Sequence, residues 1–171
     1  FKGNRMVGAL NETESRGYRW MNSSHPSGGL LLIPYPLDSS RQITLEVRIF
    51  KHKTRPRLTD GKLCMEVDIE AELVFYEEQG EGQLLEPAMI GKIESLANEQ
   101  ITREISACIS QSQKLRSDVL GWGLAVSRYQ PDVWDSLEED WPDIFPGLDY
   151  RLKVKSKITQ SYLTNRNFQF N

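Results

Sequence analysis

A strict alternation of apolar and polar side chains over residues 63–75 restricts the fold more than any other feature of this sequence. Every odd position in this segment is apolar, and four even positions carry carboxylates: Glu66, Asp68, Glu70 and Glu72. Because successive side chains of a β-strand point to opposite faces, the pattern predicts a strand with one buried and one solvated face. Asp60-Gly61 just before it is a two-residue hairpin signal, so an antiparallel neighbouring strand should precede it.

Two further segments alternate with the same period. In the first, four side chains are expected to face the core: Ile43, Leu45, Val47 and Ile49. In the second, the inward positions are Tyr150, Leu152, Val154 and Ile158, and the outward positions are basic: Arg151, Lys153, Lys155 and Lys157. Opposite charges on adjacent strands stabilise a sheet, so this basic strand is predicted to lie beside the acidic one. The alternative is two unrelated solvated faces.

Helical periodicity predicts a layer that covers the sheet. Apolar residues, Val119 among them, recur at spacings of three and four over residues 90–126, which indicates a long helix that begins near Pro87. Gly121 and Gly123 each weaken a helix, so a bend or break is expected near residues 117–123. A further helix should begin at Pro131-Asp132, with one apolar face: Trp134, Leu137 and Trp141.

Two shorter elements are expected nearer the amino terminus. Asn11 and Glu14 fit a capping box, so a short helix should span about residues 12–20, weakened by Gly17. The apolar run of residues 30–33 should form a strand that the two following prolines end.

These elements together predict an α+β fold, with a mainly antiparallel sheet covered on one face by a long helix and shorter helices. A length of 171 residues suits a single domain. Residues 2–5 are interpreted as a hairpin loop whose first strand lies upstream, so a longer parent chain is expected. Residues after about 163 are interpreted as a tail. A net charge of −3 disfavours nucleic acid as a partner, and no apolar run is long enough to cross a bilayer.

Few residues suggest catalysis. Cys64, Cys108, His25 and His52 lack the spacing of metal ligands, and no GxSxG, HExxH, GxGxxG or GxxxxGK[ST] motif occurs. Acidic side chains do cluster in residues 132–143, and glycoside hydrolases use paired carboxylates. Most of these carboxylates fall opposite the tryptophan face of the predicted helix, so they are interpreted as its solvated side. We therefore expect no enzyme activity, no metal and no cofactor.

Aromatic residues are concentrated in the carboxy-terminal half of the chain. Four of them are candidate contacts to a partner or a ligand: Trp122, Tyr129, Trp134 and Trp141. Such rings can form a ligand cage or a protein-binding hot spot, but at helical spacing they also pack a helix onto a sheet. Both interpretations stay open.

Three segments in this half resemble one known family, in the order 117–123 (SDVLGWG), 129–134 (YQPDVW) and 141–146 (WPDIFP). The family is Ger(x)C, the lipoprotein C subunits of spore-germination nutrient receptors. Residues 1–8, the strand over 67–76 and the closing strand over 154–158 extend the resemblance to about residue 163. The resemblance implies that residues 1–171 are a single carboxy-terminal domain of such a lipoprotein.

The resemblance also implies a location and partners. A signal peptide and a lipid-bearing cysteine would precede this region, so neither Cys64 nor Cys108 would carry the lipid. The lipoprotein would lie at the outer surface of the inner spore membrane and assemble with integral-membrane A-type and B-type subunits. The expected function is a non-catalytic structural and interaction domain of the receptor. The alternative is direct binding of a small-molecule germinant through Trp122 and neighbouring aromatic residues.

Overall fold

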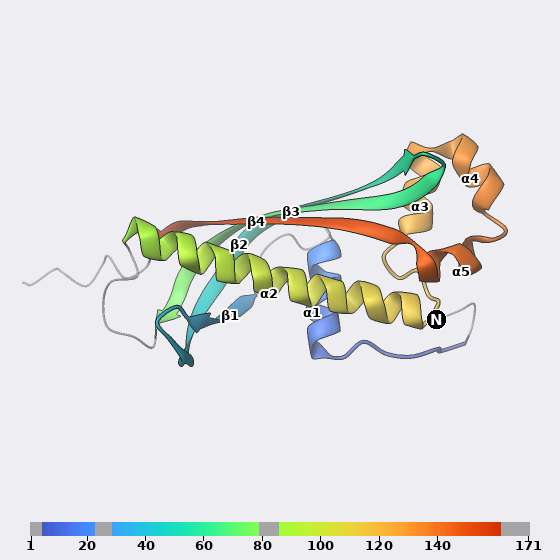
Figure 1. Cartoon of the computed structure of the whole chain (residues 1–171). Helices are drawn as coiled ribbons and strands as arrows, with labels where there is room; N and C mark the ends of the chain where they lie inside the picture. Colours follow the sequence, from blue (N-terminus) through green and yellow to red (C-terminus); the bar gives the residue numbers. More distant parts are fainter. Residues whose placement is uncertain (1–4, 23–28, 79–85, 162–171) are drawn as a thin grey trace, which may run out of the picture.

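The computed structural model describes residues 5–22, 29–78 and 86–161. Four strands form one sheet in the order β1-β2-β3-β4 (Figure 1): β1 (Leu30–Tyr35), β2 (Asp38–Thr59), β3 (Lys62–Glu78) and β4 (Asp149–Ser161). The pairs β1–β2 and β2–β3 are antiparallel, whereas β4 runs parallel to β3. The sheet is therefore mostly antiparallel, and the predicted adjacency of the acidic and basic strands is confirmed.

Helices lie on one face and at one end of this sheet (Figure 1). They are α1 (Glu12–Met21), α2 (Pro87–Lys114), α3 (Trp122–Tyr129), α4 (Pro131–Leu137), α5 (Trp141–Ile144) and the 3-10 turn η1 (Phe145–Gly147). The long helix α2 follows the length of the sheet, and α1 crosses α2 and packs against it. The short helices α3 to α5 gather at the end of the sheet where β2 turns into β3. This arrangement is the α+β fold predicted from the sequence.

The core lies between the inner face of the sheet and α2. Leu45 and Leu73 of the sheet and Ile101 and Ile105 of α2 are all fully buried in one continuous cluster. Burying each such side chain contributes roughly 1.5–3 kcal/mol. Because the cluster lies on one side of the sheet only, the charged side chains of the strands face solvent on the other.

The predicted hairpin turn and the predicted helix cap are both present. The β2–β3 hairpin turns at Asp60 and Gly61, whose φ angles of 52° and 74° are those of a two-residue hairpin turn. The Asn11 side chain accepts from the Glu14 backbone N–H at 3.0 Å, and Glu14 Oε2 accepts from the Asn11 N–H at 2.7 Å. This reciprocal capping box fixes the start of α1.

One inward assignment in β2 was wrong. Ile43, Leu45 and Val47 are buried as predicted, but Ile49 is 42% exposed and Phe50 is buried in its place. The β2–β3 register shifts between Val47 and Ile49, which is the signature of a β-bulge. The extra residue exchanges the two faces of the strand from that point onward, so odd-numbered residues after the bulge face solvent.

Three element boundaries also differ from the prediction. The long helix ends at Lys114, and Val119, assigned to its apolar stripe, is 39% exposed in the connection to α3. The helix that begins at Pro131 stops at Leu137, so Trp141 opens a separate short helix. Strand β1 continues through Pro34, which the outermost strand of a sheet tolerates. The predicted opening loop, except for Arg5, and the predicted tail lie outside the described residues.

Candidate functional site

The outer face of the sheet carries three parallel rows of charge, which we call the charged ladder. Its residues are Lys51, Lys53, Arg55 and Arg57 of β2, Glu66, Asp68, Glu70 and Glu72 of β3, and Arg151, Lys153, Lys155 and Lys157 of β4. The acidic row lies between the two basic rows. In register, Asp68 pairs with Lys53 on one side and with Lys153 on the other, and Glu70 pairs with Lys51 and Lys155.

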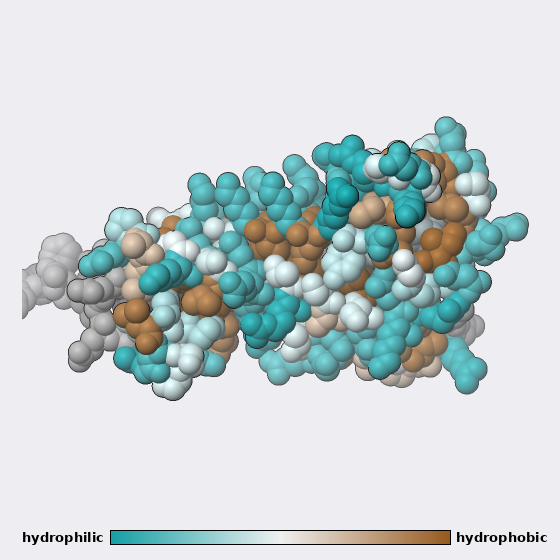
Figure 2. All heavy atoms as spheres, in the orientation of Figure 1, coloured by the Kyte–Doolittle hydropathy of each residue, from teal (hydrophilic) through white to brown (hydrophobic). Residues whose placement is uncertain are grey.

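Basic charge is in excess on this face. The charged ladder contains eight basic and four acidic side chains, although the whole chain has a net charge of −3. All of them are exposed except Glu66, which is half-buried. Among the described residues, one ion pair within the ladder is closer than 4 Å, between Arg57 and Glu66 at 3.2 Å. Figure 2 shows hydrophilic side chains projecting along the top of the molecule, on the side of β3 and β4 turned away from α2.

The helices α3, α4 and α5 carry the four candidate aromatic residues, and we call this part of the molecule the aromatic end. Asp118 holds it together. Its Oδ1 accepts from the backbone N–H of Trp122 at 3.0 Å, and its Oδ2 accepts from the N–H of Gly123 at 2.7 Å. Oδ2 also accepts from the indole Nε1 of Trp141 at 3.1 Å. One carboxylate therefore caps the start of α3 and ties it to α5. This gives the SDVLGWG segment a structural role.

Glycine at position 123 allows the tryptophans to close over α3. A Cβ placed there would lie 2.8 Å from Trp141 Nε1 and 2.9 Å from a Trp134 ring carbon. The Trp134 and Trp141 rings meet edge to face with their centroids 5.3 Å apart. Trp122 lies beneath, 5.9 Å from Phe145 between ring centroids.

The four candidate aromatic residues are near one another in sequence but differ in exposure. Trp122 is fully buried, and its Nε1 has no hydrogen-bond partner among the described residues. Trp141 is also buried, Trp134 is half-buried, and Tyr129 is 62% exposed. Trp122 and Trp141 therefore act by packing in this structure, and Tyr129 has the surface that a contact residue needs. Contact of these residues with a partner or ligand stays a prediction.

A groove of about 550 Å³ lies between the β2–β3 turn and the short helices. Most of its lining is apolar: Leu58, Leu63, Val133, Leu137, Ile144 and Leu148. Lys62 and Asp149 add charge at its border with the charged ladder. The groove has the size and the apolar character of a ligand site, but it is open to solvent along the turn.

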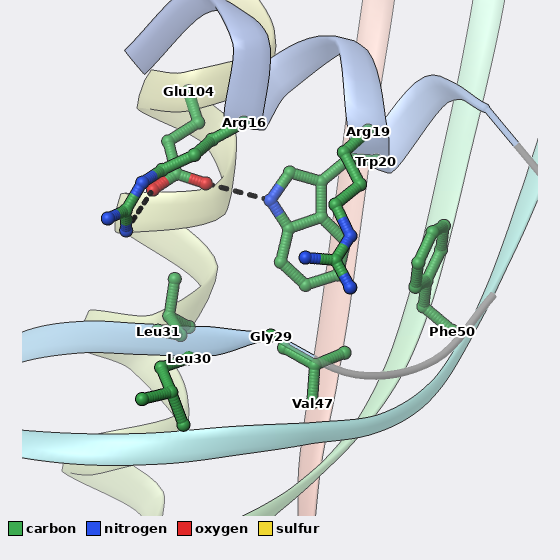
Figure 3. Close-up of a pocket in the computed structure, with 9 residues that line it drawn as sticks. All are labelled: Arg16, Arg19, Trp20, Gly29, Leu30, Leu31, Val47, Phe50 and Glu104. Carbon is green, nitrogen blue, oxygen red and sulfur yellow. Dashed lines mark hydrogen bonds and ion pairs between the residues drawn. The ribbon is translucent and has the colours of Figure 1, made fainter. Parts of the chain in front are cut away.

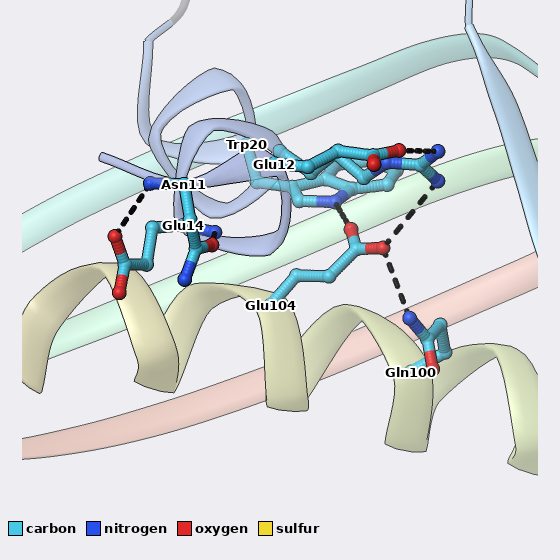
Figure 4. A network of polar contacts seen from close by, with 7 residues as sticks. Asn11, Glu12, Glu14, Trp20, Gln100 and Glu104 are labelled. Atoms are coloured by element: carbon cyan, nitrogen blue, oxygen red, sulfur yellow. Dashed lines mark hydrogen bonds and ion pairs between the residues drawn. The ribbon is translucent and has the colours of Figure 1, made fainter. Parts of the chain in front are cut away.

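Sequence reasoning missed a buried carboxylate where α1 crosses α2. Glu104 is 2% exposed, and its Oε2 accepts from the indole Nε1 of Trp20 at 2.8 Å (Figure 4). Its Oε1 accepts from Gln100 Nε2 at 3.0 Å and lies 3.9 Å from an Arg16 guanidinium nitrogen. The missed signal is the position of Glu104, three residues after Ile101 and four before Cys108 on the apolar stripe of α2.

The cavity beside Glu104 is too small for a substrate. It measures about 40 Å³, enough for a few water molecules, and it is lined by Trp20, Phe50 and the Arg19 side chain among others (Figure 3). Since the Glu104 carboxylate already accepts hydrogen bonds from two side chains, this site serves to join α1 to α2.

No catalytic arrangement is found in the described part of the chain. Burial raises the pKa of the Cys108 thiol to about 11, and burial also raises the pKa of Cys64, so neither is an activated nucleophile. Burial lowers the pKa of His52, whose Nε2 lies 2.6 Å from Thr54 Oγ1. His25 lies outside the described residues.

The acidic cluster over residues 132–143 is exposed, as its interpretation as a solvated side requires. Within it, Asp143 forms an ion pair with Arg116. Within residues 5–22, 29–78 and 86–161, no group of three metal-ligating side chains comes together. Over the same residues, no helix combines the length and the apolar character needed to cross a membrane.

Curated relatives are all spore-germination proteins of Bacillus subtilis (strain 168). The chain is 22% identical to "Spore germination protein YndF" over 92% of its own length and 39% of the relative's, and 24% identical to "Spore germination protein KC" over 72% and 30%. It is 20% identical to "Spore germination protein B3" over 91% and 41%. The chain therefore spans less than half the length of the curated relatives it matches.

A solved structure has the same fold. "Crystal Structure of the GerBC protein" superposes with a TM-score of 0.79 and 20% sequence identity, over 93% of this chain and 49% of that one. The family model described as "Spore germination B3/ GerAC like, C-terminal" matches residues 1–162. Because that match covers nearly all of the 171 residues, the chain belongs to this family, and the Ger(x)C resemblance drawn from the sequence is confirmed.

Proposed function

We propose that this chain is a non-catalytic interaction domain of a germinant receptor. It would form the carboxy-terminal domain of a lipoprotein C subunit and assemble with integral-membrane A-type and B-type subunits. A lipid anchor outside the chain would hold it at the outer surface of the inner spore membrane. Membership of the Ger(x)C family is the observation that carries this proposal.

The molecule offers formed surfaces rather than reactive groups, which supports an assembly role. The aromatic end combines exposed Tyr129 and half-buried Trp134 with the apolar groove. Aromatic side chains beside apolar grooves are typical of protein-binding hot spots. In the described residues, by contrast, burial raises the pKa of both cysteine thiols, so neither is an activated nucleophile.

A photo-crosslinking residue at Tyr129, placed in the whole lipoprotein in spores, should capture an integral-membrane receptor subunit. The matched position is Glu99, exposed on α2 away from the aromatic end, where capture should be at background. Mass spectrometry of the crosslinked product identifies the partner. Deleting residues 1–162 while keeping the anchor should abolish the germinant response, and a normal response after this deletion would count against the proposal.

Direct binding of a small-molecule germinant is the second candidate. The groove of about 550 Å³ between the β2–β3 turn and α4 favours it, because its size and apolar lining suit a small ligand. Calorimetry of the isolated chain with amino acids, sugars and nucleosides should give saturable heat. Leu137→Glu, in the groove, should abolish this heat. Leu124→Glu, at an exposed position of α3 outside the groove, should leave it unchanged. If no nutrient gave heat, direct germinant binding would be rejected and the assembly role would remain as the proposal.

A further inference from the structure

We propose that the charged ladder is a docking surface for the anionic phospholipid surface of a bilayer. The inference goes beyond assembly with receptor subunits and does not depend on it. It begins from the uneven distribution of charge, since a face with an excess of four positive charges occurs on a chain whose net charge is negative. Basic side chains clustered on one face are attracted to acidic headgroups over about a Debye length.

The basic side chains of this face are also longer than the acidic ones. Four methylene groups separate a lysine ammonium from its Cα, whereas two separate a glutamate carboxylate and one separates the Asp68 carboxylate from its Cα. Ammonium groups on long stems reach past the shorter acidic side chains of the neighbouring strand. A flat anionic surface would therefore meet the two basic rows first, with the acidic row recessed between them.

The dimensions of the ladder suit a surface rather than a single ion. Adjacent strands lie about 4.8 Å apart, so the two basic rows run roughly 10 Å apart, and each extends about 20 Å along its strand. Two shallow hollows of about 240 Å³ each lie between them. Both are lined by lysines of β2 and of β4, Lys51 and Lys155 among them, and by carboxylates of β3, Glu70 among them. Each hollow therefore offers a headgroup phosphate a cation from either side, with the acidic row between the two.

The composition of the ladder argues for lipid over protein. The centres of protein interfaces are enriched in aromatic residues and depleted of lysine, glutamate and aspartate. The ladder contains no aromatic side chain and consists of five lysines, three arginines and four carboxylates. Ile49, which is exposed where the rows end, lines the hollow at that end together with Phe50 and Ala71.

The test uses the isolated chain and vesicles of equal parts phosphatidylcholine and phosphatidylglycerol, with pure phosphatidylcholine vesicles for comparison. The chain should co-sediment with the anionic vesicles and not with the pure phosphatidylcholine vesicles. Binding to the anionic vesicles should weaken as the salt concentration is raised. Lys153→Gln with Lys155→Gln should reduce the binding constant about 25-fold, or about fivefold for each lysine. Lys92→Gln with Lys114→Gln changes the net charge equally on exposed positions of α2 and should leave binding unchanged.

A second variant pair changes binding in the opposite direction. Glu70→Gln with Glu72→Gln removes negative charge from the acidic row, so it should tighten binding to the anionic vesicles, which is a gain that misfolding would not produce. Equal effects of the ladder and α2 lysine pairs would overturn the proposal. Binding of polyglutamate without binding of the vesicles would also overturn it, because the face would then suit an acidic polypeptide.

Discussion

Replacing Gly17 with alanine should destabilise this protein by about 3 kcal/mol, although alanine is the better helix former. A Cβ at this position would lie 2.0 Å from the backbone oxygen of Glu104 and 2.8 Å from Cys108 Cβ. Since the first of these atoms is main chain, it cannot turn aside as a side-chain tip can. The helices α1 and α2 would have to separate, which would weaken the Trp20 to Glu104 hydrogen bond.

Gly91→Ala is the matched control, because Gly91 also lies inside a helix but an added Cβ there meets nothing within 4 Å. Propensity alone should then stabilise the protein by about 0.5–1 kcal/mol. Urea unfolding of the two variants measures both changes, and opposite signs are expected. If Gly17→Ala were as stable as Gly91→Ala, the close crossing of α1 and α2 would be wrong.

The sheet could be predicted wherever one strand alone holds the information. Alternation over residues 63–75 fixes the two faces of β3, and Asp60-Gly61 fixes its turn, because both signals are local in the chain. The third charged row was missed for a reason that is not local. With Ile49 facing inward, Lys51 and Lys53 would also face inward, and the bulge that turns them outward depends on pairing with β3.

The aromatic end and the helix crossing could be predicted only in part. Helical spacing allowed either packing or binding for Trp122 and Trp141, and the structure buries both, since they meet residues of other elements. Gly17 was recognised as a cost to its own helix, but its benefit depends on Glu104, more than eighty residues away. These contacts between distant segments leave no periodic trace in the sequence, whereas the alternating charges of β3 and β4 did predict that those two strands are neighbours.

Replacing Asp118 with alanine should destabilise the protein by about 3 kcal/mol and loosen its aromatic end. The change removes a charged acceptor from two backbone N–H groups of α3 and from the Trp141 indole. Loss of a helix cap costs about 1 kcal/mol, and each buried donor left without a partner adds to that cost. Thermal unfolding should move down by roughly 10 °C, given about 2–4 °C per kcal/mol for a chain of this length.

Two comparisons separate the cap from a general effect of charge. Asp132→Ala removes an exposed carboxylate from the first turn of α4, where it makes no capping hydrogen bond, so it should change stability by less than about 0.5 kcal/mol. Asp118→Asn keeps the shape, but its amide NH2 group would face a donor at one of the two oxygen positions, so it should lose more than half of the stability that Asp118→Ala loses. Amide hydrogen exchange should become faster in α3 and α5, because the Asp118 carboxylate holds these two short helices together. Exchange in α2 should stay slow, because within the described residues Asp118 makes no hydrogen bond to that helix. Equal stability of Asp118→Ala and Asp132→Ala would mean that the carboxylate of Asp118 does not hold this end together.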